Sequence, residues 1–487
     1  MAIQLDQYNN LIKVNDSVNT NAPIVLQPQG TGAVQAQLAD STATGGNARG
    51  ANAVDWQTQR NLASQIASGA NSTISGGGYN TANASLATIS GGTVNTASGY
   101  GSFVGAGNGN IASGVWSSVV AGALNSSLGT YNFIGGGFTN SGTANAAVTT
   151  QATSTITSGS TAVTLSGSNA SIKVGQYVTG TPIASDTYVA AISGTSLTLS
   201  KNATSSTNAT LSFYTPHGVV VGGGNNQATG SYSFIGGGGD AGTAANRNVA
   251  SGDWSVVCGG IKNIASGPAS FVGGGGYDGT GISGNTAAGT ASAVVCGYVN
   301  NASNIGAFIG GGTSHTNNAN LAFIGGGAWG LTRGIVGNHV FPACNAPISA
   351  TAGVQQSALL ILGAATTDAT ATVLRSNTAA AGTNNQLILP NNSAYYVRGS
   401  IVAGVTGGGD SSSWTFQGTI KRGANAASTA LVAAITPTLV SQDAGASTWA
   451  VSLTADTTNG GLAVTVTGQA ATTIRWVCKI ETTEMTY

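Results

Sequence analysis

The side chains in this chain that could carry out acid–base or metal chemistry are few and scattered. Cleavage of a polysaccharide needs two carboxylates held a few ångströms apart. The acidic residues of the middle and last parts of the chain do not recur at a regular spacing: Asp186, Asp240, Asp253, Asp278, Asp368, Asp410, Asp443 and Asp456. His217, His315 and His339 lack metal-ligand spacing. We therefore expect no catalytic residue, no cofactor and no metal.

A second group of side chains could bind a ligand without any reaction. Large aromatic residues stand three positions before a Val or Ile in several repeats: Trp116, Tyr131, Tyr232 and Trp254. On neighbouring turns of a regular coil they would stack into a lateral column, and aromatic faces suit sugar rings. The alternative is that they pack between turns or against the neighbouring insert, and both interpretations stay open.

These residues must be positioned by a fifteen-residue repeat that fills much of the first two thirds of the chain. Its β-branched anchor positions are Ile74, Ile89, Val104, Val119, Ile134, Val220, Ile235, Val257, Val272, Val294, Ile309 and Ile324. Two of the later steps are twenty-two residues, an insertion of seven that carries Asp240 or Asp278. Such a short and regular period predicts a parallel β-roll solenoid.

One repeat has room for two strands of about five residues and two tight turns. An Asn stands nine residues before most anchors, as Asn95, Asn110 and Asn263 do. Asn tolerates left-handed turns, and stacked Asn side chains can bond along a ladder. His315 occupies the same column as a substitute. The flank facing away from the interior is also apolar, so we expect a partner, and an intertwined homotrimer is the simplest choice.

Composition shifts divide the chain into segments. We assign 1–64 to virion attachment or capping, 65–144 to roll I, 145–217 to a small inserted β domain, 218–330 to roll II, 331–350 to a neck and 351–487 to a C-terminal β-sandwich. A short helix is expected over Asp55–Leu62. Alternating strands separated by turn residues predict both β modules, and Asn459-Gly460 predicts a hairpin.

The terminal sandwich is the candidate tip for binding a receptor. Trp414, Trp449 and Trp476 lie in strand-like contexts and should be core. Binding loops on a rigid β scaffold are a common arrangement. We therefore expect a receptor contact at the loop residues Asp410, Ser411, Ser412, Thr457 and Asn459.

Charge and composition exclude several other classes of protein. Lys and Arg total 14, equal to Asp and Glu, so there is no basic footprint for nucleic acid. Met1–Asp6 lacks the features of a signal peptide, and no long apolar run predicts a membrane span. The four cysteines show no paired spacing, and we expect reduced, buried thiols.

The units Asn95–Val104 and Asn110–Val119 resemble the left-handed parallel β-roll of trimeric autotransporter adhesin heads. The flanks 29–56 and 389–481 instead look like the ends of tail-fibre proteins of tailed phages, notably cyanophages and other marine phages. The resemblance covers nearly the whole chain except about 145–217. It implies a homotrimeric virion fibre, made in the host cytoplasm, that docks to the tail or baseplate through its N-terminus.

The same resemblance implies attachment to a host-surface glycan or protein, and it offers no catalytic residue to carry over. Three alternatives remain open. One is a head fibre or capsid decoration protein. Another is a polysaccharide-degrading tailspike, and the third is a structural spacer that binds nothing.

Overall fold

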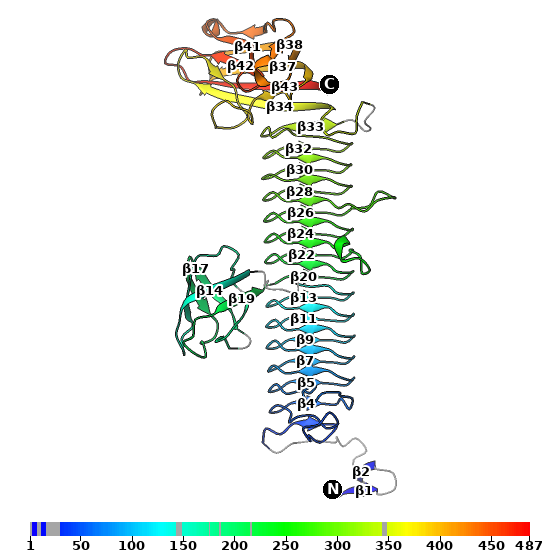
Figure 1. The fold of residues 1–487 in the computed structure, drawn as a ribbon. Coiled ribbons are helices and arrows are strands. Elements are labelled where there is room, and N and C mark those ends of the chain that lie inside the picture. The colour runs from blue at the N-terminus through cyan, green and yellow to red at the C-terminus, as the bar shows by residue number, and fades with distance from the viewer. Residues whose placement is uncertain are drawn as a thin grey trace. The chain divides into compact units, whose positions relative to one another are not determined.

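The computed structural model describes residues 2–6, 11–15, 30–142, 149–174, 176–184, 187–214, 217–342 and 348–487. Over these residues the fold is all-β, with short 3-10 turns as its helical elements. None of the helices in this described part has the length and apolar character needed to cross a bilayer. The chain divides into two compact units, 1–113 and 114–487. Figure 1 labels the strands of both.

The first unit is a parallel roll that begins earlier than the repeat pattern indicates. Strands β1 (Ala2–Asp6) and β2 (Leu11–Asn15) pair antiparallel. One parallel ladder follows, formed by β3 (Val34–Gln35), β4 (Val54–Asp55), β5 (Thr73–Ile74), β7 (Thr88–Ile89) and β9 (Phe103–Val104). A second contains β6 (Thr81–Ala82), β8 (Thr96–Ala97) and β10 (Ile111–Ala112). Parallel pairing thus reaches into the 1–64 segment.

The expected helix over Asp55–Leu62 is wrong, because Asp55 is the buried centre of an ion cluster. Its Oδ2 accepts from Arg49 Nε at 2.9 Å and from an Arg60 terminal nitrogen at 3.2 Å, with all three side chains buried. Gln57 then bonds the backbone of Asn80 in both directions. These contacts hold the segment extended against the next coil.

The second unit contains the longer roll. Its first parallel ladder is β11 (Ser118–Val119), β13 (Phe133–Ile134), β20 (Val219–Val220), β22 (Phe234–Ile235), β24 (Val256–Val257), β26 (Phe271–Val272), β28 (Ala293–Val294), β30 (Phe308–Ile309), β32 (Phe323–Ile324) and β33 (His339–Pro342). Strand β13 pairs directly with β20, so the ladder keeps its register across the insert.

A second ladder closes the other side of this roll. It contains β21 (Gln227–Ala228), β23 (Val249–Ala250), β25 (Ile264–Ala265), β27 (Thr286–Ala287), β29 (Asn301–Ala302) and β31 (Thr316–Asn317). Strand β12 (Ser126–Ser127), which precedes the insert, occupies the equivalent position in its own coil. The expectation of five-residue strands is wrong: these strands have two residues each, because tight corners use much of every coil.

Each coil buries a narrow core of its own. Strand side chains alternate between faces, and the anchor residues, such as Ile235 and Val257, are fully buried. Small residues, such as Ala228 and Ala250, are fully buried on the second ladder. Large side chains on one ladder and methyl groups on the other let two flat ladders close without a wide interior.

The Asn column forms the expected ladder inside the roll. Asn263 Oδ1 accepts from the Asn285 amide at 2.9 Å, and its Nδ2 donates to the Gly259 and Gly275 carbonyls at 3.0 Å each. The expectation of a left-handed Asn needs a correction. The residue before it has the positive φ, as Lys262 does at 61°.

The insert is a separate small barrel with its own core. Its strands are β14 (Thr149–Ile156), β15 (Ala162–Leu165), β16 (Tyr177–Thr179), β17 (Thr187–Ser193), β18 (Ser196–Leu199) and β19 (Thr210–Tyr214), closed by antiparallel pairing. Its core contains Val189, Leu197, Leu211 and Phe213. Asp186 lies outside the described residues.

The roll and the terminal module are joined by continuous hydrogen bonding. Strand β33 pairs parallel with β32 and antiparallel with β34 (Gln355–Thr366). The segment expected as a neck at 331–350 therefore contains a strand of the roll ladder. Arg333 Nε lies 3.2 Å from Glu484 Oε2, and both side chains are nearly buried.

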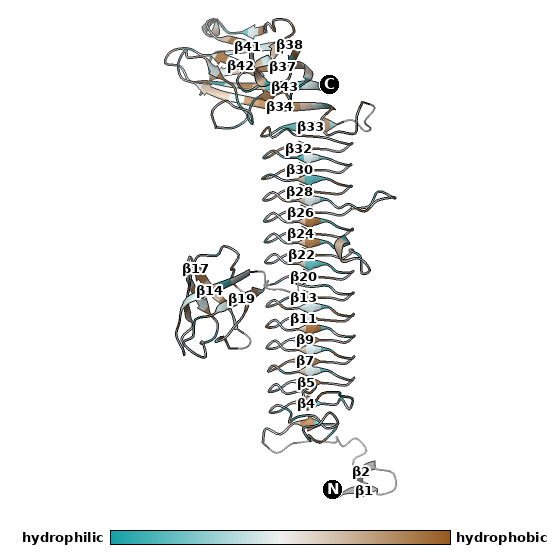
Figure 2. Cartoon of the chain, viewed as in Figure 1, coloured by the Kyte–Doolittle hydropathy of each residue, from teal (hydrophilic) through white to brown (hydrophobic). Residues whose placement is uncertain are grey.

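The terminal module has two sheets around one core. The first contains β34, β43 (Ile474–Thr486), β37 (Ser393–Val405), β38 (Ser411–Arg422), β39 (Ala430–Leu431) and β40 (Thr438–Gln442). The second contains β35 (Thr372–Val373), β36 (Leu387–Ile388), β41 (Ala450–Asp456) and β42 (Gly461–Thr467). Apolar residues gather on strands such as β34 in Figure 2.

Three tryptophans and one cysteine lie in the core of the terminal module. Trp414, Trp449 and Trp476 are buried together, as expected. Burial raises the pKa of the Cys478 thiol to about 12. The expectation that all the thiols are buried is wrong, because Cys258 and Cys296 are exposed on the roll. Cys344 lies outside the described residues.

Candidate receptor-binding surfaces

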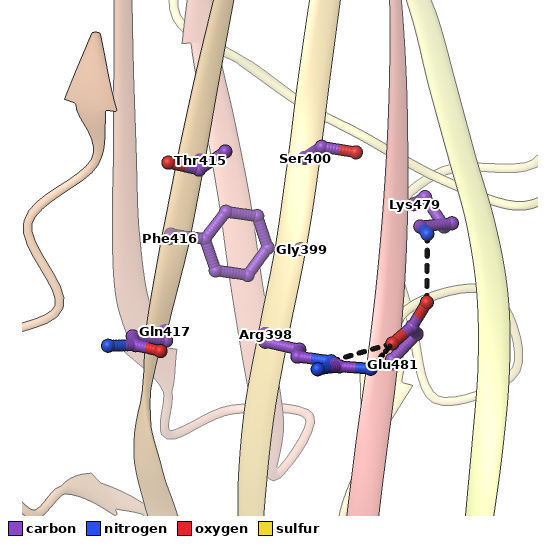
Figure 3. Close-up of a pocket in the computed structure, with 8 residues that line it drawn as sticks. All are labelled: Arg398, Gly399, Ser400, Thr415, Phe416, Gln417, Lys479 and Glu481. Carbon is purple, nitrogen blue, oxygen red and sulfur yellow. Dashed lines mark hydrogen bonds and ion pairs between the residues drawn. The ribbon is translucent and has the colours of Figure 1, made fainter. Parts of the chain in front are cut away.

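The first candidate surface is the exposed side of the sheet formed by β38, β37 and β43. Cross-strand pairing aligns one row as Gln417, Arg398 and Glu481, and the next as Thr415, Ser400 and Lys479. We call these six side chains the outer sheet face. They lie on three long neighbouring strands, so the sheet itself fixes their spacing (Figure 3).

Glu481 is the centre of the charges on the outer sheet face. Arg398 Nε donates to Glu481 Oε2 at 2.7 Å, and Lys479 Nζ donates to Oε1 at 2.8 Å. These two hydrogen bonds lower the pKa of Glu481, with the Lys479 bond the larger cause. Figure 3 shows the three side chains directed toward one another. Glu481 thus stays charged at neutral pH, and the outer sheet face offers both hydrogen-bond donors and acceptors.

A shallow hollow of about 340 Å³ lies on this face, lined by the six side chains together with Gly399 and Phe416. The Phe416 ring packs where Gly399 lacks a Cβ. Most of the lining can form hydrogen bonds, and pockets with a few converging polar groups are common ligand sites. The hollow is therefore suited to a small polar group such as one sugar ring.

A second hollow of about 280 Å³ adjoins the first along the same strands. Val402, Val440 and Val477 are about half exposed and line it, with Trp414 below. The two hollows place an apolar contact beside a charged one, a combination that protein-binding surfaces use.

The tip residues expected from the sequence do not form one surface. Ser411 and Ser412 are the first residues of β38 and not loop residues, and Ser412 is buried. Ser411 follows Asp410 in the sequence, and its hydroxyl donates a hydrogen bond to Asp443 Oδ2 at 3.0 Å. Strand pairing buries Ser412 and directs its hydroxyl to the Ser441 carbonyl.

Thr457 and Asn459 lie in the turn between β41 and β42, away from Ser411. Asn459 is held by Asp456 at 2.7 Å, and Gly460 of this turn adjoins Arg422, the last residue of β38. Ser411 begins that same strand. At about 3.3 Å per residue, the two ends of β38 are roughly 36 Å apart, so the two loops cannot contact one small ligand together.

The second candidate surface is a column of rings on one edge of the longer roll. Tyr131, His217, Tyr232 and Trp254 stack in that order, with successive ring centroids 5.1, 4.4 and 6.5 Å apart and planes within 8° of parallel. Trp116 occupies the same corner one coil before Tyr131, whose amide donates to the Val115 carbonyl. We call these five residues the aromatic corner.

His217 is the member of the aromatic corner that the sequence analysis missed. It stands three residues before Val220, so the rule that selected Tyr131 and Tyr232 also selects it. Partial burial lowers the pKa of His217, so a neutral ring is favoured in the stack. The signal was present, but the insert before His217 obscures its place in the repeat.

The two acidic loops are self-contained turns. Asp240 Oδ1 accepts from the Gly242 amide, and Asp278 Oδ1 accepts from the Thr280 and Gly281 amides. The pKa of Asp240 is lowered chiefly by a hydrogen bond from the Asn246 side chain, and then by the Gly242 amide. The Gly281 and Thr280 amides lower the pKa of Asp278. Across the described ranges, no group of three or more His, Cys, Asp or Glu side chains is placed to hold a metal ion.

No protein-family model matches the chain, and neither does any curated protein. Among solved structures, the chain is similar to the tailspike protein of Acinetobacter baumannii phage AM24. The identity is 9%, the match covers 57% of this chain and 58% of that chain, and the TM-score is 0.16. The match thus spans little more than half of that protein, and it carries no argument about function.

Proposed function

We propose that this chain is a virion protein of a tailed phage, a tail fibre that attaches to the host cell surface. The roll is the shaft, the terminal module is the binding tip, and the N-terminal segment docks to the tail or baseplate. The flanking sequences that resemble tail fibres support the virion assignment. The tip assignment depends on the structure of the terminal module.

The observation that carries the proposal is the junction between the roll and the module. Strand β33 belongs to the roll ladder and pairs with β34, which in turn pairs with β43 along its whole length. Strand β43 carries Lys479 and Glu481 of the outer sheet face. A load on that face is therefore passed into the roll through backbone hydrogen bonds, as an attachment fibre requires.

An exposed apolar stripe on the roll supports self-association. The outward residues of the first ladder include Phe133, Val221 and Val295, each about 40 to 50% exposed. In every repeat in which Phe precedes the anchor, Gly follows the anchor. The Phe ring lies against this Gly, because a Cβ at Gly273 would lie 3.3 Å from the Phe271 ring. Each ring thus lies flat along its strand. A flat apolar stripe of this kind suits a second and third copy of the same chain.

The oligomeric state is tested by light scattering on the purified chain. A homotrimer has a mass of three times 47.4 kDa. Phe271→Lys should reduce the mass, because a charge would enter the apolar stripe. Leu321→Lys is the matched control, since Leu321 is exposed at a corner and lies off the stripe. A wild-type monomer would contradict the trimer.

Host attachment is tested with full-length protein and host cells. The wild type should label cells and compete with phage for adsorption. The double variant Arg398→Ala and Lys479→Ala should lose this competition, while Lys421→Ala, on β38 outside the hollow, should retain it. Equal competition by all three proteins would contradict the tip assignment. Shortened host polysaccharide after incubation would instead indicate a tailspike enzyme.

A further inference from the structure

The aromatic corner is not required by the fold of the roll. Trp116, Tyr131, His217, Tyr232 and Trp254 all have φ between 54° and 57°. Bulky side chains are uncommon in this left-handed region. The same corner holds Ala269, Ala291 and Leu321 in later coils, also with positive φ. A methyl group therefore satisfies the backbone, and the row of rings needs another explanation.

The rings are also accessible. Tyr131 and Tyr232 are 50% exposed and Trp254 is 60% exposed. One face of Trp254 lies toward Tyr232, with the planes 3° from parallel. The next coil places only the methyl group of Ala269 at this corner, and the Ala269 amide bonds to the Asp253 carbonyl. Among the described residues of the roll, none thus stacks a ring on the second face of Trp254.

A polar hollow is lined partly by residues that directly precede members of the aromatic corner in the sequence. The volume of this hollow is about 250 Å³. On the roll it is lined by Asp253, the residue before Trp254, and by the hydroxyl groups of Thr229, Ser231, Ser251 and Ser266. Lys173 and Gln176 of the insert line it as well, and Lys173 Nζ lies 3.1 Å from Asp253 Oδ2. Hydroxyls, a carboxylate and an ammonium group beside an exposed indole can bind the hydroxyls and the apolar face of one sugar.

The position of the insert indicates that this edge faces outward. The chain leaves the roll after Gly142 and returns at His217, which is itself a member of the aromatic corner. Copies that associate through the apolar stripe must leave room for the insert at this edge. An oligomer formed in this way would leave the aromatic corner open.

We propose that the aromatic corner and its hollow form a lateral binding site for a polysaccharide of pyranose sugars. One sugar ring lies on the free face of Trp254, and its hydroxyls bond in the hollow. Further sugars run along the exposed ring edges of Tyr232, His217 and Tyr131. This inference rests on the proposed attachment function, and it adds a second contact away from the terminal module.

The test is binding of full-length protein to a printed array of oligosaccharides from bacterial O-antigens and capsules. Wild-type protein should bind at least one pyranose glycan, and Trp254→Ala should weaken that binding at least tenfold. Trp254→Phe should retain part of it, because a ring remains. Leu321→Ala is the matched control: the same corner, exposed and left-handed, in a coil without the column. It should bind as the wild type does.

The outcomes separate this inference from the proposed function. If no glycan binds, or if Trp254→Ala binds as well as the wild type, the lateral site is overturned. Attachment through the outer sheet face then still stands if the cell-adsorption competition succeeds. If the glycan binds through Trp254 but the protein neither labels cells nor competes with phage, the lateral site stands and host attachment falls.

Discussion

Arg333 in the roll and Glu484 in the last strand of the terminal module form an ion pair with an Nε–Oε2 distance of 3.2 Å. Gln356 also donates to the same carboxylate oxygen, at 2.9 Å. The Arg333 guanidinium lies 5.7 Å from the centre of the Tyr395 ring. Burial, with Glu484 as a second cause, raises the pKa of Tyr395. The junction is thus a compact, largely buried polar cluster.

We expect Arg333→Met to destabilise the terminal module by about 3–5 kcal/mol, because Glu484 would remain buried without its cation. Adding Glu484→Gln should restore part of the loss. Hydrogen exchange of β34 and β43 measures the effect locally. Arg398→Met is the control, since its ion pair with Glu481 is exposed and should have no measurable effect. Equal protection in all variants would show that the pair does not couple the two parts.

The Asn column should be essential to the stability of the roll. Asn300 bonds the Cys296 and Gly312 carbonyls and accepts from the His315 amide at 3.1 Å. Asn300→Ala would remove the acceptor of the buried His315 amide and one donor to each of the two part-buried carbonyls. Losing the acceptor of the buried amide should cost about 1–3 kcal/mol. Asn301→Ala, at the next and exposed position, should change the urea midpoint little. Similar midpoints for the two variants would contradict a role for the ladder.

His315 should make the roll sensitive to acid. Its Nδ1 accepts from the Gly330 amide at 2.9 Å, and burial lowers its pKa from 6.5 to about 4. At a pH between these two pKa values, His315 binds a proton in the unfolded chain but not in the folded chain. The free energy of unfolding should therefore fall as pH drops from 6.5 to about 4 and then level off. His315→Asn should reduce this loss, measured as the change in Tm with pH.

Gly399 should be intolerant of any side chain. A Cβ at this position would overlap the Phe416 ring and the Lys479 carbonyl. Gly399→Ala should therefore cost about 1–3 kcal/mol through overpacking and reshape the hollow on the outer sheet face. Gly404→Ala, on the same strand with no atom nearby, is the matched control. Calorimetry on both variants checks the prediction, and an unchanged Tm for Gly399→Ala would refute it.

The repeat made the roll predictable because residues fifteen apart occupy equivalent positions. The anchors Ile134 and Val220 follow this rule even across the insert. The period-2 alternation of residues 396–402 likewise predicted part of β37. The outward position of Cys258 could have been found in the same way, because it directly follows the buried anchor Val257.

The candidate surfaces were harder to predict. The outer sheet face depends on β37 lying between β38 and β43, and Arg398 and Glu481 are 83 residues apart. Local sequence does not encode that order of strands. The exposure expected for Ser412 failed for a related reason, because its neighbour β40 is distant in sequence. His217 was missed because the insert that precedes it obscures its place in the repeat.

The corners of the roll have a consequence for how such a protein can change. Two seven-residue insertions and a whole barrel enter at corners, and the ladders on either side keep their pairing. Adding one coil of fifteen residues would lengthen the roll by about 4.8 Å and alter neither end. The length of the roll and the segments inserted at its corners can therefore change independently of each other. An engineer could graft a new domain at the Gly142–His217 corner and set its height by the number of coils.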